Sequence, residues 1–220
     1  VKEIFVSLPS GKKIQKIKTN EQQNKPEVLL KHKKTDQTHL VLGFRAYDIF
    51  DKRKHALQVL SDILGGSMSS RLWQKIREQM GAAYYVRAEA DIFTDHGYLA
   101  MSAGVDNKRV EEIIKAALEE FQKISEYCVD NTELQRAKDH LTGQLFLSLE
   151  SSDEWASFYG GQEILTKETL SPQEVAEKIQ AVKAEEIMAV AKDIFQNNKL
   201  NLALIGPFED KKKFEKILKI

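Results

Sequence analysis

The sequence is poor in cysteine and has no excess of either charge. One cysteine, Cys128, stands among 220 residues, so no disulfide can form within the chain. Cys128 lies beside Tyr127 in a stretch that we expect to be helical, where a small, buried or half-buried apolar side chain is its expected role. The 33 basic and 33 acidic residues cancel, so the chain lacks the long-range field that gathers nucleic acid or an anionic membrane.

Long hydrophobic runs are also missing. No apolar run approaches the roughly 18 residues of a membrane span, and no charged-then-apolar leader precedes the first expected strand. We therefore expect neither a membrane nor nucleic acid among the partners, and the cytoplasm is the favoured compartment. The chain begins at Val1 rather than Met, so this inference does not extend to any segment upstream.

The first 25 residues differ in composition from the rest. An apolar fragment, VKEIFVSL, is followed by a polar run with too few large apolar residues for a core of its own. We predict that the fragment is the end of a helix and that the polar run is a linker. Residues 26–220 are long enough to bury a core without disulfides.

Within residues 26–220, two strands and a pair of helices precede a hairpin, and a series of helices with one further strand follows. An order of this kind predicts an α+β fold, in which helices cover an antiparallel-rich sheet mainly on one face. Hydrophobic periodicity places strands at 27–33, 38–46, 83–93, 97–105 and 200–205, and helices at 56–64, 69–80, 110–124, 132–149, from 151, from 171, at 184–196 and from 210.

Glycines and serines mark the expected helix ends. Gly65 and Gly66 end the first helix, and we expect Gly65 to take a left-handed conformation there. Gly81 suits a left-handed cap at the end of the next helix, which Ser69 or Ser70 begins. Capping boxes are expected to open three later helices, from Thr132 with Gln135, Ser151 with Glu154, and Ser171 with Glu174.

The chain contains no motif of a metal site or of a nucleophilic enzyme. Zinc peptidases need two histidines one helical turn apart with a glutamate on the same face. None of the five histidines, at positions 32, 39, 55, 96 and 140, has such neighbours, so we assign no metal ligand and no catalytic residue. The Gly65-Gly66-Ser67 turn lacks the lysine and the further glycine of a phosphate loop, and we interpret it as a structural turn.

One stretch carries a specific resemblance. Residues 64–86, LGGSMSSRLWQKIREQMGAAYYV, place a glycine pair, an amphipathic helix, a glycine stop and an aromatic strand in direct succession. This segment resembles the signature of the C-terminal half of the insulinase/pitrilysin family of zinc metalloendopeptidases, which includes mitochondrial processing peptidase. The resemblance extends over about residues 26–214.

The resemblance has implications for the whole chain. It implies the metallohydrolase half-unit of the processing-peptidase type, with residues 1–25 as the end of a preceding half plus a linker and residues 26–220 as the C-terminal half-domain. In this family the inverted H-x-x-E-H zinc motif lies in the first half. The resemblance therefore implies that the complete enzyme contains zinc bound by its N-terminal half, that this chain binds none, and that this chain alone is inactive.

Two residues of this segment are candidates for contact with substrate. Arg77 and Tyr84 match the family pattern R-E-x-x-G-x-A-Y, in which the two side chains reach across a chamber toward the peptide. By the same resemblance the Gly65-Gly66 turn borders that chamber. The residues alone also allow a simpler interpretation, in which Arg77 is a solvated helix cation and strand alternation places Tyr84 on the apolar face with Val86.

Our leading hypothesis is a substrate-binding C-terminal half of a zinc metalloendopeptidase that cleaves peptides or unfolded segments. Its expected partners are the N-terminal half or a homologous chain and a peptide substrate, and its exposed pairing surface also allows oligomers. The alternative is a non-catalytic scaffold or regulatory subunit of the same fold. A peptide-binding module that acts without a partner is a third possibility. Retention of Arg77 and Tyr84 favours the peptidase.

Overall fold

The computed structural model describes residue 11, residues 16–17 and residues 19–220. The expected helix end at residues 1–8 lies outside these described residues. The division into a linker before residue 26 and a half-domain after it stays a prediction. The described elements are, in chain order, β1 (Glu27–His32), β2 (Gln37–Ala46), α2 (Lys54–Gly65), the π-helix η1 (Trp73–Gln79), β3 (Ala83–Ile92), β4 (Gly97–Asp106), α3 (Val110–Glu126), α4 (Asn131–Leu147), α5 (Ser152–Leu165), α6 (Pro172–Gln180), α7 (Ala184–Ile194), the short 3₁₀ helix η2 (Asn197–Lys199), β5 (Leu200–Gly206) and α8 (Lys212–Ile217).

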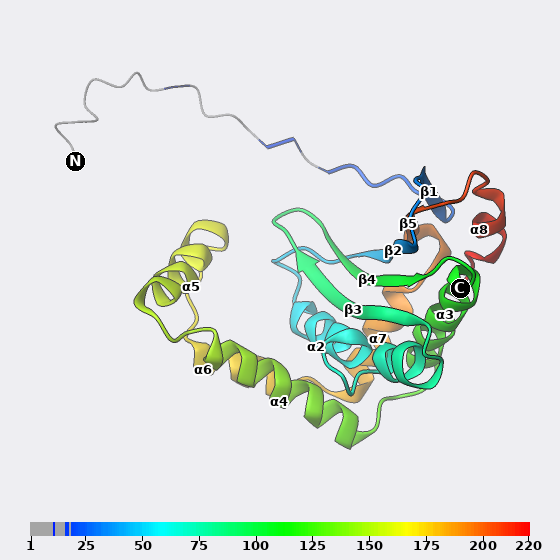
Figure 1. The fold of residues 1–220 in the computed structure, drawn as a ribbon. Coiled ribbons are helices and arrows are strands. Elements are labelled where there is room, and N and C mark those ends of the chain that lie inside the picture. Colours follow the sequence, from blue (N-terminus) through cyan, green and yellow to red (C-terminus); the bar gives the residue numbers. More distant parts are fainter. Residues whose placement is uncertain (1–10, 12–15, 18) are drawn as a thin grey trace.

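The five strands form one sheet in the order β1-β5-β2-β4-β3. Only β1 and β5 run parallel, and the other three pairings are antiparallel. Helices α2, α3 and α7 lie beneath one face of this sheet (Figure 1). The expected α+β class and the expected one-sided helical cover are both confirmed.

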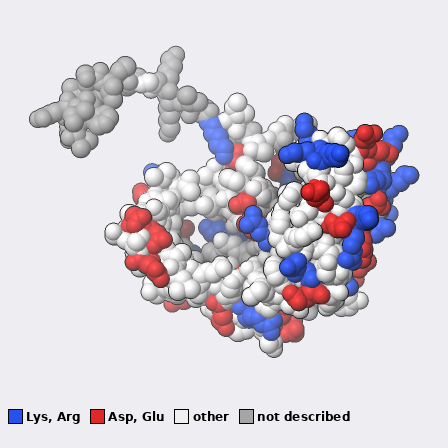
Figure 2. All heavy atoms as spheres, in the orientation of Figure 1, with Lys and Arg blue, Asp and Glu red and all other residues white. Residues whose placement is uncertain are grey.

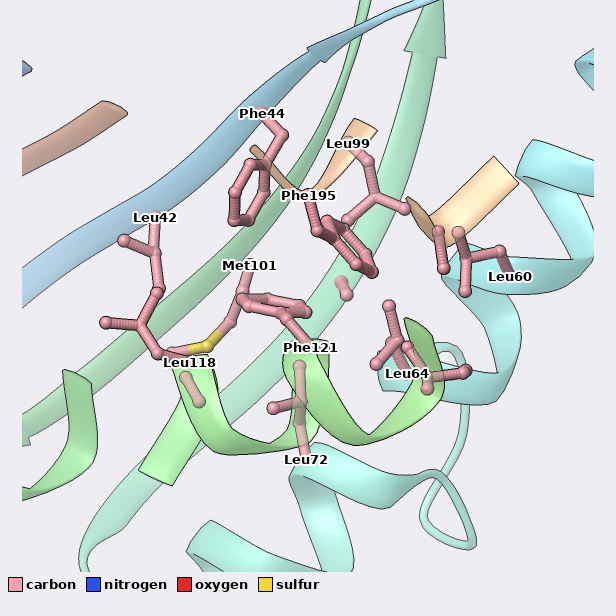
Figure 3. Close-up of a cluster of buried hydrophobic side chains, with 14 of the residues drawn as sticks. Leu42, Phe44, Leu60, Leu64, Leu72, Leu99, Met101, Leu118, Phe121 and Phe195 are labelled. Atoms are coloured by element: carbon pink, nitrogen blue, oxygen red, sulfur yellow. The ribbon is translucent and has the colours of Figure 1, made fainter. Parts of the chain in front are cut away.

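The core lies between the sheet and these three helices. Leu42 and Phe44 of β2 and Leu99 and Met101 of β4 point from the sheet toward the helices, as Figure 3 shows. The Phe44 ring packs edge-on against that of Phe121, with the ring centroids 5.3 Å apart. Alternating burial along β2 and β4 therefore commits one sheet face to the core and leaves the other open.

The open face carries a regular grid of side chains, because the strand registers align them in rows. One row crosses the sheet through Lys31, Ile205, His39, Gly104 and Tyr85. The next row consists of Leu29, Ala203, Val41, Ser102 and Arg87. No described helix covers these two rows.

Helix α5 stands apart from this body. It has no buried residue, and Figure 1 shows it at the end of an arm that α4 and α6 connect to the core. The segment 150–165 contains four acidic residues and no basic one. Figure 2 accordingly shows mainly white and red atoms in this part of the molecule. None of the described helices is both long enough and apolar enough to span a bilayer.

Two local expectations are wrong. Cys128 is exposed in the loop after α3, with its Sγ atom 3.7 Å from Met188 Sδ, because α3 ends two residues earlier. Helix α4 begins after Asp130, whose carboxylate accepts hydrogen bonds from the backbone N–H groups of Thr132 and Glu133. Asp130 caps α4 because a short carboxylate there reaches two free N–H groups, which leaves no such role for Thr132.

Candidate functional site

The Gly65-Gly66 turn needs glycine because a side chain at either position would collide with neighbouring atoms, and not because of an unusual backbone conformation. The expected left-handed conformation of Gly65 is wrong: Gly65 is the last residue of α2, and Gly81 is the only described glycine with a positive φ. A Cβ atom at Gly65 would lie 2.6 Å from Ala88 Cβ and 2.8 Å from Ala88 Cα. The end of α2 thus rests directly on the backbone of β3.

Gly66 makes room for a buried carboxylate. A Cβ atom at Gly66 would meet the side chain of Asp62, which is 6% exposed. Asp62 Oδ1 lies 2.7 Å from His140 Nδ1, and this contact joins α2 to α4. Burial raises the pKa of Asp62, while the hydrogen bond from His140 opposes the rise. Both glycines therefore have a structural role.

A π-helix follows this turn. The Met80 N–H donates to the Lys75 carbonyl, and Leu72 and Ile76 are fully buried beneath this helical turn. The expected serine cap is wrong, because Ser70 Oγ donates to the Ser67 carbonyl. The expected left-handed cap at Gly81 is confirmed, with φ +58°. Single π-helical turns often occur at functional sites.

Tyr84 lies at a β-bulge at the start of β3. Ala83 pairs with Val105 and Tyr85 pairs with Gly104, so Tyr84 has no partner of its own on β4. The expected placement of Tyr84 on the apolar face with Val86 is wrong. The bulge shifts the alternation by one residue, and Tyr84 is 60% exposed. Its phenol is a free surface group and not part of the core.

Arg77 holds the base of this bulge. Its Nη1 atom donates a 2.6 Å hydrogen bond to the carbonyl of Ala83, the residue before Tyr84. Within the described residues Arg77 makes no ion pair, and its side chain is exposed. The structure thus brings Arg77 and Tyr84 to one place, at the junction of the π-helix and β3.

Two arginine contacts hold the residues that flank the π-helix. Arg71 forms a two-pronged contact with Glu133 of α4, with distances of 2.8 Å and 2.7 Å. Arg109 Nη1 donates to the Met80 carbonyl at 2.8 Å. Charge-assisted pairs of this geometry are among the stronger surface contacts. Contacts with α4 and with the residue before α3 therefore fix the position of the π-helix that carries Arg77.

The described part of the chain does not fit a zinc ion. Among the described residues no three histidine, cysteine, aspartate or glutamate side chains gather as ligands. Each histidine has its own partner: His32 with the Phe208 carbonyl, His39 with Tyr85, His55 with Gln58, His96 with Asp95, and His140 with Asp62.

Sequence reasoning missed one further feature beside the bulge. Tyr85 lies over Gly104 of β4, where a Cβ atom would stand 2.6 Å from the Tyr85 ring. Its hydroxyl is 3.1 Å from His39 Nδ1 on β2. Gly104, a glycine near the end of the expected strand 97–105, was the available signal, because a glycine within a strand often marks a close approach.

The fold and this site define a metallopeptidase-type half-domain whose described residues hold no metal site. A family model described as "Peptidase M16 inactive domain" matches residues 1–141. An uncharacterized zinc protease of Streptomyces coelicolor is 33% identical over 179 residues, which cover 81% of this chain and 39% of that protein. The uncharacterized zinc protease YmxG of Bacillus subtilis is also 33% identical, over 82% of this chain and 44% of YmxG.

Two solved structures share the fold. A protease from Helicobacter pylori matches with a TM-score of 0.82 and 19% identity, over 94% of this chain and 50% of that one. The peptidase M16 inactive domain from Pseudomonas fluorescens matches with a TM-score of 0.81 and 21% identity, over 94% and 50% of the two chains. The chain belongs to the peptidase M16 family, the insulinase family of the sequence resemblance, as its inactive C-terminal half. It spans less than half the length of these curated relatives.

Proposed function

We propose that this chain is the substrate-binding half of a zinc metalloendopeptidase, in which Arg77 and Tyr84 contact the peptide. The observation that carries the proposal is the bulge at Tyr84, which leaves the Tyr84 phenol exposed one residue after the carbonyl that the exposed Arg77 side chain binds. The relatives are named as zinc proteases, which supports a complete enzyme with zinc bound by its N-terminal half.

The two side chains have chemistry suited to a peptide carbonyl. A phenol hydroxyl donates one hydrogen bond, and a guanidinium offers several N–H groups in a planar fork. Nη1 of Arg77 is engaged by the Ala83 carbonyl, and the other N–H groups of this exposed side chain make no hydrogen bond to the described residues, so they can meet an acceptor on a peptide. Donors fixed in advance stabilise the negative charge that develops on a carbonyl oxygen during cleavage.

Cleavage by the complete enzyme tests this proposal. Tyr84→Phe removes only the hydroxyl, and we expect kcat/KM to fall about a hundredfold, the typical effect of removing one such donor. Arg77→Lys should also be slow, because an ammonium lacks the planar fork. Zinc content and melting temperature should not change. Tyr127→Phe is the matched control, because Tyr127 is 67% exposed in the loop after α3, outside this site.

The alternative, a scaffold or regulatory subunit that pairs with a homologous chain, makes the opposite prediction. Wild-type kinetics for Tyr84→Phe would remove Tyr84 from the site. No cleavage by the wild-type protein, combined with stable pairing to a homologous chain, would favour the scaffold.

A further inference from the structure

The part of the open-face row that runs from the bulge to β5 is aromatic and apolar. Tyr85, His39 and Ile205 follow one another across strands β3, β2 and β5, with Gly104 of β4 beneath Tyr85. The rings of His39 and Tyr85 stack with their centroids 6.0 Å apart and their planes 27° apart. We call His39, Tyr85 and Ile205 the aromatic shelf.

The shelf is both rigid and accessible. Gly104 is buried beneath Tyr85, so the Tyr85 ring rests on the backbone of β4. The bond to His39 satisfies the Tyr85 hydroxyl and fixes the direction of the ring. Tyr85 is nevertheless 37% exposed and Ile205 is 43% exposed. A rigid aromatic ring with a satisfied hydroxyl gives contact area at a low cost in conformational entropy.

Charged side chains bound the shelf. Lys31 lies at the β1 end of the same row, and Arg87 lies on β3 in the adjacent row. Arg87 Nε donates to Ser102 Oγ at 3.2 Å, which holds the guanidinium over that neighbouring row. Exposed Leu29 and Val41 in the adjacent row continue the apolar surface beside the shelf, so an extended peptide can lie along this face with one large side chain on the shelf.

We propose that the aromatic shelf binds an aromatic or large aliphatic side chain of the same peptide whose backbone Arg77 and Tyr84 contact. The proposal rests on the proposed function, and it adds a preference for substrate sequence. Continuity carries the choice of occupant, because Tyr84 and Tyr85 are consecutive residues that the bulge exposes together. An extended peptide rises about 3.3 Å per residue and its side chains alternate between two faces, so a peptide whose backbone meets Tyr84 presents a side chain toward Tyr85 within one or two residues.

A peptide panel with the complete enzyme tests the shelf. Peptides that differ at one position, with Phe, Leu, Ser or Gly, should show the highest kcat/KM with Phe or Leu. For the Phe and Leu peptides, Tyr85→Ala should reduce kcat/KM about fivefold, which is the typical effect of losing one aromatic contact. For the Ser and Gly peptides the reduction should be less than about twofold. Tyr98→Ala is the matched control, because Tyr98 is 38% exposed on the same face but pairs with Asp91 at the opposite end of β3.

Equal losses for all four peptides, or no loss, would overturn the shelf. Should Tyr85→Ala fail to fold, Ile205→Ser replaces it, with the same selective loss expected. Tyr84→Phe separates this proposal from the proposed function, because it should slow all four peptides by the same factor.

A binding experiment covers the case in which the wild-type enzyme cleaves none of the peptides, so that the proposed function fails. The imidazole NMR signals of His39 should then shift on addition of the Phe peptide and not of the Gly peptide, and this response should disappear in Tyr85→Ala. An unchanged His39 signal with every peptide would refute the shelf independently of catalysis.

Discussion

Replacing Gly65 by alanine should destabilise the protein, although alanine is the better helix former. The new Cβ atom would lie 2.6 Å from Ala88 Cβ and 2.8 Å from Ala88 Cα, whereas ordinary carbon contacts begin near 3.5 Å. The Ala88 backbone nitrogen also meets this atom, so no rotamer change relieves the contact. Helix α2 and strand β3 must therefore move apart.

The size of the effect follows from two opposing contributions. Overpacking of a well-packed core costs up to about 3 kcal/mol, and replacing glycine by alanine inside a helix regains about 1 kcal/mol. The free energy of unfolding should therefore fall by about 2 kcal/mol. For a chain of this length that loss lowers the melting temperature by about 4–8 °C.

Thermal unfolding followed by circular dichroism measures this change. Gly143→Ala is the control, because Gly143 lies within α4 and a Cβ atom there meets nothing within 4 Å. Gly143→Ala should leave the melting temperature unchanged or raise it. Adding Ala88→Gly to Gly65→Ala should not restore stability, since the backbone of β3 stays in place. A Gly65→Ala protein that melts at or above the wild-type temperature would refute the contact.

The pKa of Asp62 is raised by burial, so the folded state holds this proton more tightly than the unfolded state does. As the pH rises above about 4, the free energy of unfolding of the wild-type protein should therefore fall relative to that of Asp62→Asn. Urea titrations at several pH values measure this difference, and a difference that stays constant with pH would contradict the prediction. Ser171→Ala should lower the free energy of unfolding by about 1 kcal/mol, because it removes the capping box of α6. Ser151→Ala removes the same kind of capping box from α5, which has no buried residue, so it should speed only the local amide hydrogen exchange of α5. Equal losses of global stability in the two variants would contradict this. The dialysed chain should retain no stoichiometric zinc in metal analysis, and zinc that is lost on mutation of a histidine would overturn the assignment of this chain as the metal-free half.

Regular elements were predictable because their signal is local. Alternation in residues 38–46 and 97–105 identified β2 and β4, and Ser151 and Ser171 identified the starts of α5 and α6. Arg77 and Tyr84 were selected as candidates through a motif of eight residues, and in the structure the Arg77 guanidinium donates to the backbone carbonyl of Ala83, the residue before Tyr84.

The remaining features depend on contacts between distant residues. The requirement for glycine at position 65 arises from Ala88, 23 positions away, so the sequence around Gly65 suggested a backbone conformation that the chain does not adopt. Alternation assigned Tyr84 to the buried face because it assumes regular pairing, and the bulge is visible only in the register with β4. The shelf likewise joins three strands that the sequence separates.

The bulge and Arg77 depend on each other physically, and this determines which substitution reports on chemistry. A bulge interrupts the ladder and leaves backbone groups without a strand partner. The carbonyl of Ala83, the residue before the unpaired Tyr84, accepts from Arg77 Nη1. Arg77→Ala would remove this donor, so the start of β3 could return toward regular pairing and carry Tyr84 with it. A loss of activity in Arg77→Ala therefore combines a missing guanidinium with a displaced phenol. Tyr84→Phe leaves the Arg77 contact and the bulge intact, so its rate change belongs to the hydroxyl alone.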